Sequence, residues 1–74
     1  MRIDVERFDS GWIGLQFIMT KEESAKLRKL LLALESEEIG HFHTHSLDLD
    51  GEPGVVDVEF SLLGPDEMSN TAFG

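Results

Sequence analysis

Residues 1–8 and 12–19 alternate between apolar and polar side chains, and a period of two predicts half-buried strands. The apolar side of these two runs comprises Met1, Ile3, Val5, Ile13, Leu15, Phe17 and Met19. Asp9-Ser10-Gly11 separates the runs and fits a three-residue hairpin loop, in which the glycine takes the left-handed position. Pairing Phe8 with Trp12 brings the two apolar sides into register. We therefore expect an antiparallel hairpin at the start of the chain.

The pattern changes to a helical one at Thr20. The segment Thr20-Lys-Glu-Glu23 is a capping box, in which the hydroxyl and the carboxylate each accept a hydrogen bond from a free backbone amide. We expect a helix that runs to about Ser36 and is followed by a stop signal at Gly40. The helix carries an apolar stripe that we assign to the core, formed by Leu27, Leu30, Leu31 and Leu34.

Residues 41–49 and 55–63 predict a second hairpin across a turn at residues 50–54. The last run has a clean apolar side, formed by Val56, Val58, Phe60 and Leu62. The expected fold is α+β in the order ββαββ, a four-stranded, mostly antiparallel sheet with one helix packed on its apolar face. Residues 1–64 would form this single domain. Residues 65–74 would form a tail or add a short edge strand.

Three histidines, His41, His43 and His45, occupy alternate positions of the third predicted strand. Alternate residues of a strand project to the same side, so the imidazoles would stand in a row about 7 Å apart. Neighbouring histidines on a strand can share a metal ion such as zinc. The alternative is a row of solvated histidines, or of histidines paired with carboxylates, because this spacing alone is a weak metal signature.

The face that the histidines occupy depends on the register of the second hairpin. Pairing Leu49 with Val55 places His45 opposite Glu59 and His43 opposite Ser61, on the polar side. This register leaves Leu47 and Leu49 on the polar face. A one-residue slip or bulge would bury those leucines instead, so the pattern leaves both arrangements open.

The open face of the expected sheet carries Trp12 and Phe8, with four carboxylates around them: Asp4, Glu6, Asp57 and Glu59. Exposed aromatic side chains are typical hot spots of protein interfaces. The alternative is that the two aromatic rings only pack across the hairpin end.

Composition narrows the class of protein. The 74 residues carry a formal net charge of −9, which argues against a nucleic-acid partner and favours a basic protein partner. There is no cysteine and no apolar run long enough for a membrane span, so we expect a cytoplasmic protein. We expect no enzyme activity. Ser46, His45 and Asp48 have the residue types of a catalytic triad, but neighbouring residues of one strand point to opposite faces, so the hydroxyl could not meet the imidazole. The DLDGEPG segment also lacks the closing ligand of a calcium loop.

Several short motifs occur in a familiar order: DSGWIGLQF, a capped leucine-rich helix, HFH, GEPGVVDVEF and a terminal segment ending in FG. In this order the chain resembles small bacterial proteins that are grouped as predicted immunity proteins of polymorphic toxin systems (immunity protein 32-like). The resemblance spans nearly the whole chain. It implies an α+β domain that binds and blocks a toxin, and an acidic chain would suit a basic, nuclease-like toxin. A self-associating subunit, able to form a homodimer, is the other non-catalytic alternative.

Overall fold

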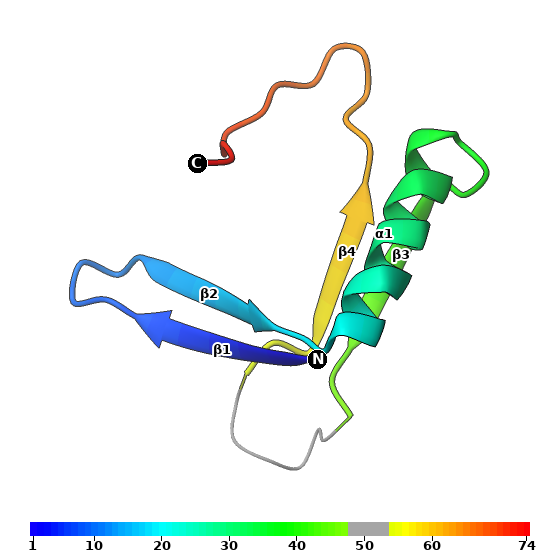
Figure 1. Cartoon of the computed structure of the whole chain (residues 1–74). Coiled ribbons are helices and arrows are strands. Elements are labelled where there is room, and N and C mark those ends of the chain that lie inside the picture. Colours follow the sequence, from blue (N-terminus) through cyan, green and yellow to red (C-terminus); the bar gives the residue numbers. More distant parts are fainter. Residues whose placement is uncertain (48–53) are drawn as a thin grey trace.

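The computed structural model describes residues 1–47 and 54–74. It contains four strands and one helix in the order ββαββ, which confirms the predicted α+β class (Figure 1). The elements are β1 (Arg2–Arg7), β2 (Ile13–Ile18), α1 (Lys21–Glu35), β3 (His41–His45) and β4 (Asp57–Ser61). The predicted turn at residues 50–54 lies almost wholly outside the described residues.

The strands pair as two separate antiparallel sheets, β1 with β2 and β3 with β4, where we expected one four-stranded sheet. Figure 1 shows the β1–β2 hairpin extending away from the layer that α1 forms with β3 and β4. Alternation along a strand specifies which face is buried, but it does not specify which strand edges join. This difference divides the expected open face between two sheets.

The first hairpin has the predicted register. Val5 lies opposite Leu15, and the backbone N–H of Phe8 donates to the carbonyl of Trp12 at 2.9 Å. Gly11 has a φ of 91°, a left-handed conformation that glycine adopts without steric cost. The loop geometry and the apolar pattern thus agree.

The second hairpin is shifted by two residues from the register in which His45 would lie opposite Glu59; His43 lies opposite Glu59 and His45 opposite Asp57. An even shift keeps every side chain on its expected face, so the apolar pattern cannot distinguish the two registers. The stacking of Phe42 on Phe60 distinguishes them, because these rings lie directly opposite each other with centroids 4.6 Å apart.

Both ends of α1 are capped. The Thr20 hydroxyl accepts from the amide of Glu23, and the Glu23 carboxylate accepts from the amide of Thr20, both at 3.0 Å. At the other end the amide of Glu37 donates to Leu34 and that of Glu38 to Ala33, the two hydrogen bonds of a Schellman motif. The left-handed residue of this motif is Glu37, with a φ of 64°, and not the predicted Gly40.

The described residues have a very small core. Only Leu34 and Phe42 are buried among the hydrophobic side chains, and Leu31 of the predicted stripe is 42% exposed. The accessible surface of 6929 Å² compares with about 4,600 Å² for a compact monomer of this mass. The radius of gyration, 14.4 Å, likewise exceeds the roughly 11 Å of a compact domain of this length. The fold is open, with apolar surface left uncovered.

Residues 62–74 contain no strand, and all but Gly64 are exposed. Near the start of this segment the amide of Gly64 donates to the Glu67 carboxylate at 2.6 Å. Leu62, which we expected on the apolar side of the last strand, lies beyond β4 and is 51% exposed. In the part of the chain that the structure describes, no helix has the length and apolar character to cross a membrane.

Replacing Glu37 with glycine should stabilise the protein. A side chain in the left-handed region costs about 1 kcal/mol that glycine avoids, so the free energy of unfolding should rise by about that amount. Urea denaturation of the variant measures the change. The control is Glu37→Gln, which removes the charge at the helix C-terminus and keeps the strained backbone; an equal gain in both variants would contradict the conformational explanation.

The capping box should make stability depend on pH. The Met1 amino group and the Thr20 amide both donate to Glu23, and they hold the pKa of its carboxyl below the usual value of 4.5. The stabilisation is therefore complete above pH 4.5 and is lost as the pH falls through the lowered folded-state pKa. Wild type should exceed Glu23→Gln in free energy of unfolding at neutral pH, and this difference should vanish in acid. Glu22→Gln removes a neighbouring first-turn charge without touching the capping box, and it should show a smaller pH-dependent difference.

Candidate functional site

Four of the six residues predicted to bind a partner lie on one side of the first hairpin. This hairpin face consists of Asp4, Glu6, Phe8 and Trp12. The ring of Phe8 lies over Gly14, where a Cβ atom would stand 3.3 Å from the ring. Trp12 is 78% exposed, so cross-strand packing covers little of its indole. The hairpin face is an aromatic surface beside two carboxylates, one of which, Asp4, pairs with Arg2 at 3.2 Å.

The other two predicted residues, Asp57 and Glu59, lie on β4 in the second sheet. The structure therefore does not join them to the hairpin face. It joins them to the histidines in a group that we call the histidine cluster: His41, His43, His45, Asp57 and Glu59. Of the two arrangements that the sequence pattern left open, the structure has the one in which all three histidines share the polar face with the β4 carboxylates.

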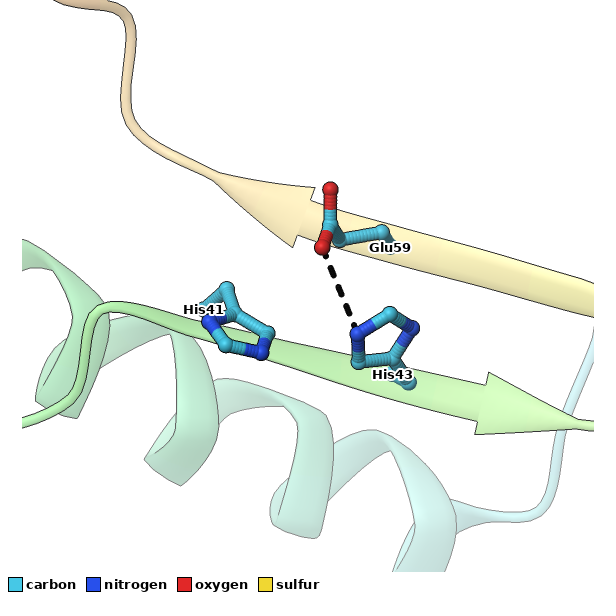
Figure 2. A group of neighbouring side chains, drawn as sticks. All are labelled: His41, His43 and Glu59. Atoms are coloured by element: carbon cyan, nitrogen blue, oxygen red, sulfur yellow. Dashed lines mark ion pairs between the residues drawn. The ribbon is translucent and has the colours of Figure 1, made fainter.

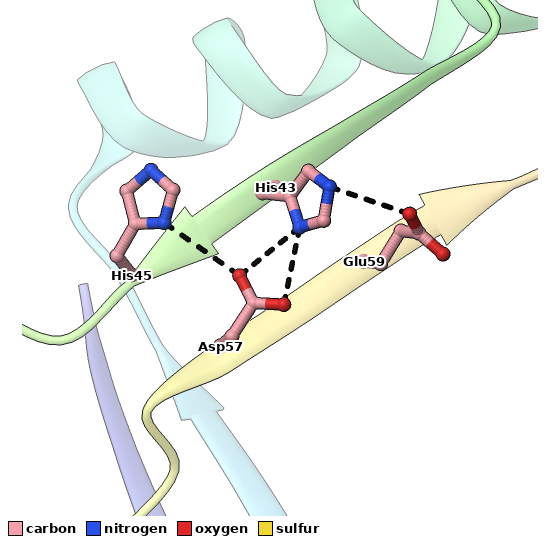
Figure 3. A network of polar contacts seen from close by, with 4 residues as sticks. All are labelled: His43, His45, Asp57 and Glu59. Carbon is pink, nitrogen blue, oxygen red and sulfur yellow. Dashed lines mark hydrogen bonds and ion pairs between the residues drawn. The ribbon is translucent and has the colours of Figure 1, made fainter.

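His43 is the centre of the histidine cluster. Its Nδ1 lies 3.0 and 3.1 Å from the two carboxylate oxygens of Asp57, and its Nε2 lies 3.3 Å from a carboxylate oxygen of Glu59 (Figure 3). His45 reaches Asp57 at 3.6 Å. The ring is thus held between two carboxylates that come from the opposing strand.

His41 approaches His43 edge to face, with ring centroids 5.1 Å apart, closer than the spacing of about 7 Å along an ideal strand. Figure 2 shows His41, His43 and Glu59 as neighbours on the two strands. Ligand-type atoms of these three residues all lie within 4.8 Å of one another. The sequence missed Glu59 as a member of this set, because only the register of β4 brings it opposite His43.

A third feature is an apolar groove of about 490 Å³ between the helix and both sheets. Its apolar lining includes Phe17, Leu27, Leu30, Phe42 and Phe60. These side chains belong to the apolar faces that we expected to form the core. The groove lies on the opposite side of the first hairpin from the hairpin face, because Phe17 is on the apolar side of β2.

Comparison with known proteins gave no match to a family model, a curated protein or a solved structure. The resemblance to predicted immunity proteins stays a prediction, and function has to be argued from these surfaces.

The exposure of Trp12 predicts the fluorescence of the protein, because this is its single tryptophan. The folded monomer should emit like indole in water and should be quenched by acrylamide nearly as strongly as the urea-unfolded chain. A blue-shifted, protected emission at low protein concentration would contradict the open hairpin. Protection that appears only as concentration rises would instead report self-association.

Proposed function

We propose that this protein is a non-enzymatic binding module that covers a basic surface of a protein partner with its hairpin face. The observation that carries the proposal is the exposure of Trp12, at 78%, beside Phe8 and the carboxylates of Asp4 and Glu6. Tryptophan is enriched among the residues that dominate binding energy. An indole that remains in water in the free protein is available for burial in a complex.

The surface area supports the same proposal. The chain exposes about 2,300 Å² more than a compact monomer of its mass, and a standard interface needs about 800 Å² from each partner. The net charge of −9 favours a partner with a basic surface, whose approach it would accelerate at low salt. The resemblance suggests a nuclease-like toxin as the kind of partner.

The test is a paired capture from a lysate of the source cells, with wild type and Trp12→Ala immobilised at equal density. A basic protein should be retained by wild type at low salt and released at high salt. With that protein purified, Trp12→Ala should weaken binding by about 2 kcal/mol, close to thirtyfold in Kd. Met68→Ala is the matched control, because Met68 is 90% exposed and lies in the tail. Equal retention by all three proteins would refute the hairpin face as the binding surface.

Charge should act mainly on the rate of association. Glu6→Gln in the hairpin face should lower the association rate constant at low salt and flatten its salt dependence, with a smaller effect on dissociation. Stopped-flow mixing with the captured partner measures both rates.

Self-association is the second candidate, and one observation favours it. In the described part of the chain each strand pairs along one edge only, and free strand edges are templates for pairing with another chain. Light scattering over a range of concentrations separates the candidates. A stable dimer whose formation protects Trp12 from acrylamide would replace the foreign partner with a second copy of this chain.

A further inference from the structure

We infer that His41, His43 and Glu59 form a binding site for a divalent transition-metal ion, for which zinc is the natural probe. Two imidazoles and one carboxylate are a recurring protein ligand set for zinc, with a fourth position left open. Here the three residues come from two paired strands, and their ligand-type atoms lie within 4.8 Å of one another (Figure 2). The site is separate from the hairpin face and does not depend on the proposed function.

The distance between His43 and Glu59 fits a shared metal ion. Zinc–nitrogen and zinc–oxygen bonds of about 2.0–2.1 Å in a tetrahedral arrangement place two ligand atoms about 3.3 Å apart. Nε2 of His43 and Oε1 of Glu59 are separated by 3.3 Å. The pair already has the separation that two zinc ligands need. His41 is exposed, so rotation of its side chain can bring the third ligand atom closer.

The contact of His43 with Asp57 supplies an independent argument. An ionised carboxylate only accepts hydrogen bonds, so Nδ1 of His43 is the donor in its contacts with Asp57 at 3.0 and 3.1 Å (Figure 3). A neutral ring protonated at Nδ1 directs the lone pair of Nε2 toward Glu59. Metal-binding histidines are oriented in this way by a carboxylate on the second ring nitrogen. Asp57 is therefore a positioning residue.

Two acceptors, the Nε2 lone pair and the Glu59 oxygen, would repel each other at this distance without a positive centre between them. A second ring proton, making an imidazolium between two carboxylates, would satisfy the same geometry. Zinc titration distinguishes a bound metal ion from a second ring proton as the positive charge between Nε2 of His43 and Glu59. With an imidazolium as the only occupant, zinc would neither bind nor stabilise the protein.

The experiment is calorimetric titration of the full chain, without a histidine tag, with zinc chloride. We expect one zinc ion per chain with a micromolar dissociation constant, and a raised melting temperature because the metal would link β3 to β4. His43→Ala and Glu59→Gln should each weaken binding at least about tenfold. His45→Ala is the matched control, a histidine of the same strand outside the ligand set, and should change affinity by less than about threefold. Circular dichroism and urea denaturation without zinc verify that each variant folds.

Absence of zinc binding to wild type at millimolar metal would overturn the proposal. It would also be overturned if His45→Ala were as damaging as His43→Ala while Glu59→Gln was neutral, because the three histidines would then be the ligands. One zinc ion per two chains would overturn the site within a single chain.

Asp57→Asn tests the positioning role. The variant should bind more weakly by about tenfold, since the ring loses its orienting carboxylate. With cobalt as a spectroscopic substitute, it should keep the visible absorption of the wild-type ligand set once saturated. A changed spectrum at saturation would make Asp57 a ligand and contradict the assignment.

Discussion

The stacking of Phe42 on Phe60 is the interaction on which the organised half of this molecule depends. The rings lie 4.6 Å apart and nearly parallel, and Phe42 is one of the two buried hydrophobic residues of the described chain. Because the pair is directly opposite across β3 and β4, it sets the register of every neighbour on the polar side. The contacts of His43 with Asp57 and Glu59 follow from that register.

The first hairpin stands under a different constraint. Its turn and register are specified locally, yet its apolar face remains largely uncovered, with Ile13 at 55% and Leu15 at 45% exposure. A domain of this length buries only roughly 60% of its unfolded surface even when compact. An open arrangement buries less, so the hydrophobic contribution to stability is small and a binding partner would stabilise the folded state by mass action. Binding and folding would then be thermodynamically linked.

The two surfaces have different chemistry. The hairpin face offers aromatic area beside carboxylates that act through long-range attraction, and such charges affect association rates more than final affinity. In the histidine cluster, Asp57 and Glu59 are held by the ring nitrogens of His43. Two carboxylates that were expected to face a basic partner thus have a local partner, and the proposed binding surface narrows to β1, β2 and their loop.

The sequence by itself determined the local structure: the first hairpin and its register, the capping box at Thr20, and the common side of the three histidines. Each depends on residues close in the chain or on strand periodicity, which nearest-neighbour chemistry specifies. Only the tertiary structure decided that the strands form two sheets, and that Glu59 is the residue whose ligand-type atom lies within 4.8 Å of those of His41 and His43. The alternating apolar pattern is unchanged when one strand slides by two residues along its partner. It assigns each side chain to a face and leaves the position along the partner strand to the packing of a single aromatic pair.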